Sequence, residues 1–179
     1  MEKIGVFCSA TPGLPAAYMV AAQQFGQWLG EQGKTLVYGG SSRGLMGAVG
    51  KACHLAGGRL YGMVPAILEE RGWVEPELDV TFPCEGLTDR KDLMMLESQV
   101  FVALPGGIGT LDEVFTVLGH TSIGLSEKKV VLLNLDGFFD TLLAFLRELN
   151  EKNFIRQPLS AYLCVANSVD ELCKLIENE

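Results

Sequence analysis

The chain has 179 residues, of which 48% are hydrophobic and 20% charged, a composition typical of one globular domain. Its formal net charge of −8 argues against a nucleic-acid surface, because such surfaces neutralise phosphates with clustered Lys and Arg. No apolar run is long enough for a membrane span or a secretory signal, so we expect a single cytoplasmic domain over residues 1–179 with no membrane partner.

Short apolar runs alternate with amphipathic segments along the chain, which is the pattern of helices that cover a parallel sheet. The sequence therefore predicts an α/β fold, a Rossmann-like, doubly wound, mainly parallel sheet of about seven strands with helices on both faces. In chain order we expect strand 4–8, helix 15–32, strand 35–38, helix 45–56, strand 59–64, a long functional or covering loop 65–77, strand 78–83, helix 88–98, strand 100–104, helix 110–122, strand 130–133, helix 137–150, strand 162–166 and helix 169–176.

The five cysteines do not have the spacing of a metal site or of a redox pair. No C-x-x-C motif occurs, and no histidine stands at metal-ligand spacing from a cysteine. We therefore expect buried, reduced thiols, and neither a metal nor a redox cofactor. The cysteines are residues 8, 53, 84, 164 and 173.

The motif PGGIGT, residues 105–110, stands where a strand passes into a helix. Because glycine permits positive φ angles and close approach of the main chain, we expect backbone amides to converge there. The start of the following helix adds unpaired amides and a positive dipole end, an arrangement that suits one phosphate group. This loop contains neither a G-x-G-x-x-G dinucleotide motif nor the G-K-[ST] lysine of a P-loop. The predicted phosphate-binding residues are Gly106, Gly107, Gly109 and Thr110; the alternative is a tight turn with Thr110 as N-cap.

Glu113 has two interpretations. Thr110 to Glu113 reads T-x-x-E, a capping box in which the glutamate bonds back to the cap residue. Alternatively, a carboxylate one helical turn beyond a phosphate loop faces the sugar of a bound nucleotide.

Two other strand-to-helix loops carry candidate ligands. The loop GGSSRG, residues 39–44, repeats the strand-loop-helix pattern, so Gly40 and Ser41 are candidate substrate-binding residues. Ser9 follows the first strand and is a third candidate. All three residues are also ordinary turn or cap residues, and that alternative stays open.

A polar cluster, Thr88 to Asp92, opens the helix before the glycine-rich strand. Arg90 and Lys91 form either a solvated helix start or an anion-recognition site. Lys91 has the further alternative of pairing with Asp89 or Asp92 and orienting the loop.

LTDRKDLM at 87–94 and PGGIGTLDE at 105–113 together resemble the R-K and P-G-G-x-G-T-x-x-E motifs of the Lonely Guy family, the cytokinin riboside monophosphate phosphoribohydrolases. GVFCSATPG, VYGGSSRGLMG and VVLLNLDGFFDTLLAFL extend the likeness along nearly the whole chain. The resemblance implies hydrolysis of the N-glycosidic bond of adenosine 5'-monophosphate, often N6-modified, to free base and ribose 5-phosphate. It implies that Arg90 and Glu113 are the catalytic pair, with Lys91 nearby.

This family was long labelled as possible lysine decarboxylases. Pyridoxal phosphate enzymes need a Schiff-base lysine, and Lys91 is the only lysine near the predicted site, so we expect no such cofactor. The sequence departs from the family at Leu87–Thr88, where Met-His is common, at Ile108, where tyrosine is common, and at His120, where tryptophan is common. These departures indicate a different pocket for the base.

A carrier that binds a nucleotide or the molybdenum cofactor without catalysis is the alternative function, and it would have no need of Glu113. We also expect a homodimer, because the segment 110–125 is apolar around much of its circumference. The resemblance implies a dimer with the site near the interface; the alternative is burial of this segment within one subunit.

Overall fold

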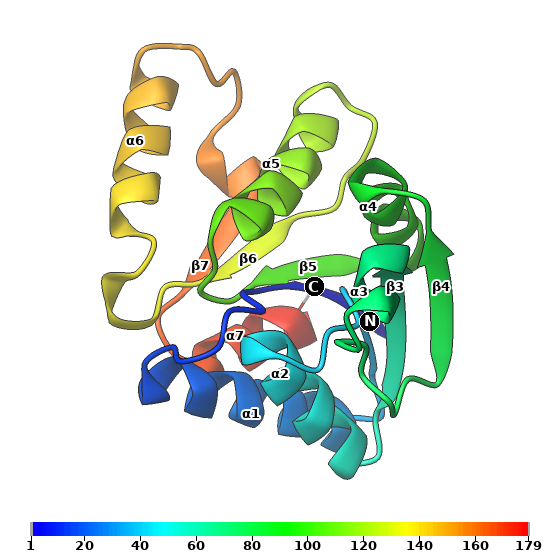
Figure 1. The fold of residues 1–179 in the computed structure, drawn as a ribbon. Coiled ribbons are helices and arrows are strands. Elements are labelled where there is room, and N and C mark those ends of the chain that lie inside the picture. The colour runs from blue at the N-terminus through cyan, green and yellow to red at the C-terminus, as the bar shows by residue number, and fades with distance from the viewer. Residues whose placement is uncertain (1, 179) are drawn as a thin grey trace.

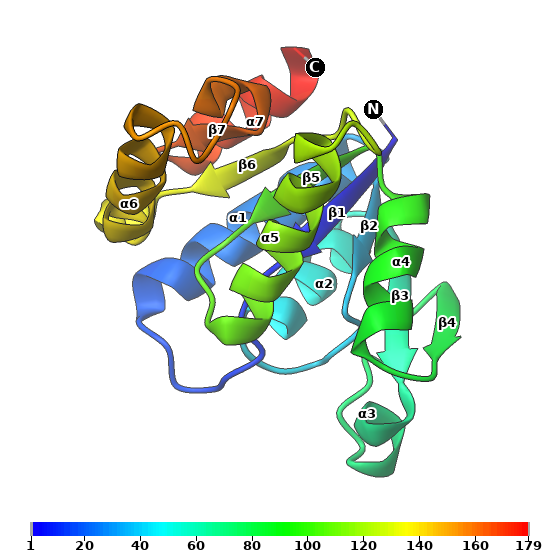
Figure 2. The ribbon, with the colours of Figure 1, turned by 90° about the horizontal axis from the view of Figure 1, so that it is seen from above.

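The computed structural model describes residues 2–178, which form a parallel sheet covered by helices on both faces (Figure 1). The expected α/β architecture is confirmed. All seven strands run in one direction in the order β4-β3-β2-β1-β5-β6-β7, and Figure 2 shows β4 at one edge and β7 at the other. The strands are β1 (Lys3–Phe7), β2 (Thr35–Tyr38), β3 (Arg59–Pro65), β4 (Val80–Cys84), β5 (Val100–Ala103), β6 (Val130–Leu133) and β7 (Leu163–Ala166). The helices are α1 (Ala16–Glu31), α2 (Gly44–Leu55), α3 (Ala66–Glu70), α4 (Leu87–Glu97), α5 (Ile108–Ser122), α6 (Asp140–Glu151) and α7 (Val169–Asn178).

The inner strands are buried on both faces, which explains their unbroken apolar sequences. Every residue of β2, β5 and β6 is buried. The edge strand β4 instead alternates exposed and partly buried residues and contains Pro83, which an edge strand tolerates because it donates fewer ladder hydrogen bonds. Two separate cores result, one on each face of the sheet.

Helices α1, α2 and α7 cover one face, and α4, α5 and α6 cover the other (Figure 1). The first core joins Phe25 of α1, Val49 of α2 and Ile176 of α7, all fully buried. The second joins Val117 of α5 and Leu143 of α6 to the opposite face of the sheet. The chain is therefore doubly wound, as the alternation of strands and helices predicts.

Most boundaries differ from expectation by one or two residues, and two segments differ by more, for local reasons. The segment 65–77 is not an unstructured loop, because it contains the short helix α3. Helix α6 begins at Asp140 rather than at 137. A 3-10 turn at Leu135–Gly137 precedes it, with Asp136 at φ 52°, and the Asn134 side chain accepts a hydrogen bond from the amide of Phe139 at 2.7 Å.

The order of the strands places a topological switch point at β1, where sheets of this kind have their ligand-binding crevice. Successive strands extend from β1 toward β4 on one side and toward β7 on the other, and ligands of such sheets bind at the carboxyl end of this switch point. Ser9 joins the loops there: its amide donates to the carbonyl of Pro105 at 3.3 Å, and its carbonyl accepts from the amide of Leu45 at 2.8 Å. The loops after β1, β2 and β5 thus meet at one point.

Within residues 2–178, no helix is long and apolar enough to cross a membrane.

Candidate active site

Helix α5 begins at Ile108, with Gly107 as its N-cap and no side-chain cap. Thr110 therefore lies inside the helix, and the interpretation of Thr110 as N-cap of a capping box is wrong. The amides of Ile108, Gly109 and Thr110 find no hydrogen-bond acceptor within residues 2–178. Unpaired amides at the start of a 15-residue helix, at its positive dipole end, can bind an anion.

At the start of α2, unlike at the start of α5, two backbone amides are hydrogen-bonded to another loop. The carbonyl of Ser9 accepts from the amides of Leu45 and Met46 at 2.8 and 3.3 Å. Ser41 is only 1% exposed, and its hydroxyl accepts a hydrogen bond from the amide of Arg43 at 3.3 Å. Of the two helix starts beside the crevice, α5 has the free donors, whereas the polar groups of the second loop stabilise its own turn.

The glycines of the loop 105–110 do not use the positive φ angles that the sequence predicts. Positive φ occurs instead in the second loop, at Gly40 (69°) and Gly44 (56°). At Gly106 a side chain would overlap that of Thr110, whereas at Gly107 and Gly109 a Cβ would meet open space. These last two glycines therefore leave room for a ligand beside the free amides.

Arg90 of α4 and Glu113 of α5 face each other, as expected for a catalytic pair. Nη2 of Arg90 lies 3.7 Å from Oε1 of Glu113, and the two side chains are 11% and 9% exposed. Burial raises the pKa of the Glu113 carboxyl from its ordinary 4.5 to about 7; Arg90 opposes this rise and the charge of Asp112 adds to it. Near neutral pH the carboxyl therefore exchanges its proton readily, as a general base requires.

Gly39 and Cys8 shape the surroundings of this pair. A side chain at Gly39, just after β2, would overlap Nη2 of Arg90. Nε of Arg90 is buried and has no hydrogen-bond partner among the described residues. Cys8 follows the neighbouring strand β1 and is 2% exposed; burial chiefly, and then the charge of Glu113, raise the pKa of its thiol. Cys8 thus contributes a neutral, low-polarity wall.

Lys91 does not point to the phosphate loop or pair with Asp89 or Asp92. Its Nζ binds both carboxylate oxygens of Asp112 on α5, each at 2.9 Å. Asp89 instead accepts from the amide of Glu85 at 3.0 Å. The sequence analysis missed Asp112 as a partner because it lies 21 residues away along the chain, outside any local spacing pattern.

The segment 65–77 covers the second loop and is hydrogen-bonded to it. The carbonyl of Trp73 accepts from both the amide and the hydroxyl of Ser42, at 2.8 and 3.1 Å. The guanidinium carbons of Arg43 and Arg71 lie 4.2 and 4.7 Å from the centre of the Trp73 ring, a cation–π contact on a half-buried indole. The amide of Glu75 also donates to the carbonyl of Gly40 at 2.8 Å. Gly40 and Ser41 are thus held beneath this cover.

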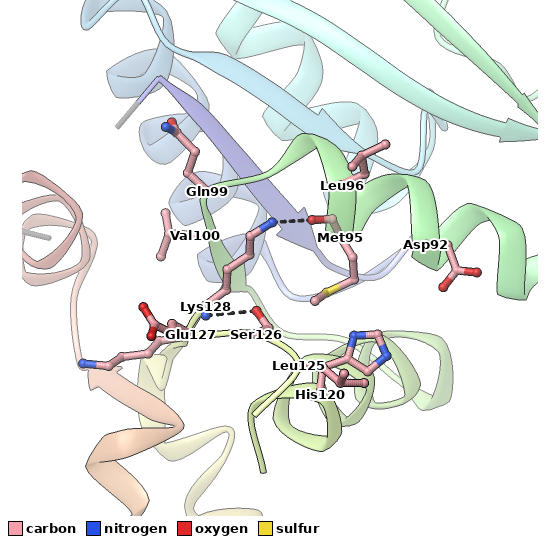
Figure 3. A pocket seen from close by; sticks show the side chains of 11 residues that line it. Asp92, Met95, Leu96, Gln99, Val100, His120, Leu125, Ser126, Glu127 and Lys128 are labelled. Carbon is pink, nitrogen blue, oxygen red and sulfur yellow. Dashed lines mark hydrogen bonds between the residues drawn. The ribbon is translucent and has the colours of Figure 1, made fainter. Parts of the chain in front are cut away.

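A separate pocket of about 660 Å³ lies at the amino ends of the strands, opposite the Arg90–Glu113 pair (Figure 3). His120 lines it together with Met95 and Lys128, whose ammonium donates to the Met95 carbonyl. His120 stands seven residues beyond Glu113, about 10 Å along the helix axis. It therefore does not border the Arg90–Glu113 pair within one subunit. Residues 2–178 contain no group of three or more His, Cys, Asp or Glu side chains placed to hold a metal ion.

We predict that Gly39→Ala displaces the Arg90 guanidinium and raises the pKa of Glu113 above the wild-type value, because Arg90 lowers that pKa. Carbon NMR titration of glutamate-labelled protein measures the shift, with Glu113→Gln to assign the signal. Leu55→Ala, at an exposed position of α2 on the other face of the sheet, is the control and leaves the titration unchanged. An unchanged pKa of Glu113 in Gly39→Ala would show that Gly39 does not determine the position of the Arg90 guanidinium.

Known proteins similar to this chain identify its family. The family model described as possible lysine decarboxylase matches residues 46–176. A probable cytokinin riboside 5'-monophosphate phosphoribohydrolase of Oryza sativa subsp. japonica is 42% identical over 177 residues, covering 98% of this chain and 72% of the relative. A cytokinin riboside 5'-monophosphate phosphoribohydrolase of Arabidopsis thaliana is 35% identical over 176 residues, covering 98% and 82%.

Solved structures with the same fold include proteins named as cofactor carriers. The molybdenum cofactor binding protein of Rippkaea orientalis and the molybdenum cofactor carrier protein of Chlamydomonas reinhardtii are each 25% identical, with TM-scores of 0.75 and 0.76. Each comparison covers 99% of this chain and 96% of the other. Because the family model spans most of the chain and the plant relatives match nearly all of it, the chain belongs to the Lonely Guy family, whose family model is described as possible lysine decarboxylase.

Proposed function

We propose that the protein hydrolyses the N-glycosidic bond of adenosine 5'-monophosphate or of its N6-modified forms, releasing the free base and ribose 5-phosphate. The observation that carries this proposal is the buried carboxylate of Glu113, which faces Arg90 one turn beyond the free amides of α5. The relatives named as cytokinin riboside 5'-monophosphate phosphoribohydrolases support a nucleotide as substrate.

The phosphate binds to the amides at the start of α5, beside Gly107 and Gly109. Glu113 lies three residues beyond Thr110, about 4.5 Å along the helix axis. A nucleotide anchored by its 5'-phosphate therefore presents its ribose to the carboxylate. Ser9 and Lys91 are held by other contacts, so the main-chain amides provide most of the phosphate binding. Binding energy from this remote group fixes the sugar and lowers the entropic part of the barrier.

The ionised Glu113 carboxylate acts on the sugar. As the bond between the anomeric carbon and the base nitrogen lengthens, its electron pair moves to the base and the sugar becomes an oxocarbenium-like cation. Glu113 stabilises this cation and accepts a proton from the attacking water, whose oxygen bonds to the anomeric carbon. The departing base takes up a proton from solvent, and Glu113 returns its own proton to solvent, which restores the carboxylate. Arg90 stays protonated at every working pH, so it positions the nucleotide and stabilises the departing base by charge rather than by donating a proton.

Replacing the carboxylate tests this role. We expect Glu113→Gln to lower kcat for adenosine monophosphate by roughly 10²-fold or more, because it removes both charge stabilisation and the base, while the nucleotide still binds. Chromatography of released adenine measures turnover and calorimetry measures binding. Glu127→Gln, in the pocket at the amino ends of the strands, is the matched control with wild-type turnover. Full activity in Glu113→Gln would refute the proposed mechanism.

The pH dependence follows from the pKa of Glu113. Because the ionised form is active and its pKa is about 7, kcat/KM rises with pH up to about 7 and falls about tenfold per unit at lower pH. Stability changes in the opposite direction. The folded carboxyl holds its proton more tightly than the unfolded one, so the free energy of unfolding decreases between pH 4.5 and about 7.

Initial rates and thermal unfolding from pH 4.5 to 8.5 measure the two trends. In Glu113→Gln we expect the acid limb of the rate profile to disappear, and the gain in melting temperature over the wild type to be larger at pH 8 than at pH 5. A rate profile that is flat through pH 7 in the wild type would contradict the assignment of Glu113 as the base.

A carrier of a nucleotide or of the molybdenum cofactor is the second candidate function, favoured by the fold shared with the two carriers at 25% identity. A carrier requires the anion site at α5 but gives the Arg90–Glu113 pair no chemical task. Incubation with adenosine monophosphate separates the two functions. Tight binding without release of adenine would support the carrier.

We infer that the protein is a homodimer in which the second subunit covers the apolar outer side of α5. Phe115 and Ile123 of this helix are 44% and 73% exposed in one chain, and Phe154 opposite them is 77% exposed. They line a pocket of about 460 Å³ between α5 and the end of α6. An apolar surface of this kind on a single chain is typical of an interface.

Light scattering tests the dimer. We expect the mass of two chains for the wild type and a shift toward one chain for Phe154→Asp. Leu55→Asp, an equally exposed leucine on α2 at the other face of the sheet, keeps the dimer mass. A monomer mass that does not change with concentration would contradict the dimer.

A further inference from the structure

Helix α4, which carries Arg90, buries few apolar residues. Met94 is the only one of its 11 residues that is buried, and Leu93 and Met95 are partly buried against the second core. Polar contacts hold its carboxyl end: Lys3 of β1 binds Glu97 at 2.6 Å, and the ammonium of Lys128 binds the carbonyl of Met95. At its amino end, where Arg90 lies, the ion pairs with α5 add to these contacts.

Two consecutive ion pairs join α4 to α5. Arg90 faces Glu113 on the buried side, and Lys91 binds Asp112 on the outer side, where the side chains are 20% and 49% exposed. The outer pair is the closer one, with Nζ 2.9 Å from both carboxylate oxygens. The inner pair, at 3.7 Å, is longer than a charge-assisted hydrogen bond, so it does not itself hold the helices together.

We infer that Asp112 is a positioning residue: through Lys91 it holds α4 against α5, so that Arg90 stays opposite Glu113. This inference rests on the proposed function for its kinetic consequence. Lys91 then acts through Asp112 and not as a ligand of the phosphate. An exposed ion pair adds little to stability, whereas a small displacement of a catalytic group lowers the rate strongly.

Kinetics of four variants test the coupling. We expect Asp112→Asn and Lys91→Met each to lower kcat for adenosine monophosphate by about tenfold, a partial loss from misplacing one group, and the double variant to lose no more than either one. Asp112→Glu keeps the ion pair and restores most of the rate. Losses that multiply in the double variant, or a loss in Lys91→Met without one in Asp112→Asn, would overturn the inference, since Lys91 would then act on substrate directly.

The pKa of Glu113 gives a second readout that needs no activity. Arg90 lowers this pKa more than Asp112 raises it. If Asp112→Asn lets Arg90 move away, the pKa of Glu113 rises; if Asp112 contributes only its local charge, the pKa falls. Carbon NMR titration distinguishes the two directions. Lys91→Met raises the pKa in either case and so shows that the method detects the shift, while Asp112→Glu leaves it unchanged.

The two readouts separate this inference from the proposed function. A wild type that releases no adenine, together with a higher Glu113 pKa in Asp112→Asn, would refute the hydrolase and retain the positioning role. A lower or unchanged pKa in Asp112→Asn would refute the positioning role whatever the activity. Thermal unfolding confirms that each variant is folded, and Lys91→Gln replaces Lys91→Met if the latter does not fold.

Discussion

The site depends on one constraint, the removal of the Glu113 carboxylate from water. In solvent this group would be ionised above about pH 5 and too weak a base to act on water. Burial beneath α4 and beside Cys8 raises its proton affinity, and Arg90 keeps the ionised form accessible by facing it at 3.7 Å. Burying an ionised carboxylate without a partner costs free energy, so the proton affinity of Glu113 depends on the position of Arg90.

The fold places Arg90 and Glu113 where they can face each other. Strands β1 and β5 are neighbours at the switch point, so the loops after them meet, and Ser9 binds the Pro105 carbonyl. Helix α5 then starts beside the crevice with its amides free, while α4 runs along it on the same face of the sheet. Gly39 completes the arrangement from β2 because only a residue without a side chain leaves room for the guanidinium.

Local patterns predicted the strands and helices well, because apolar periodicity reports which residues face a core. The pairing of Arg90 with Glu113 came from family motifs, since no spacing relates residues on two different helices. The capping-box interpretation was wrong because T-x-x-E also occurs one turn inside a helix, and the positive φ angles belong to Gly40 and Gly44. The pair Lys91–Asp112 escaped notice because it exists only once α4 and α5 lie side by side.

The carbonyl of Ser9 that caps α2 has a consequence for the shape of the ligand. It occupies the second helix end with a neutral oxygen, so only one positive helix terminus faces the crevice. The amides at the start of α5 are therefore the ones left to an anion, and a single free helix start matches a proposed substrate that carries one phosphoryl group.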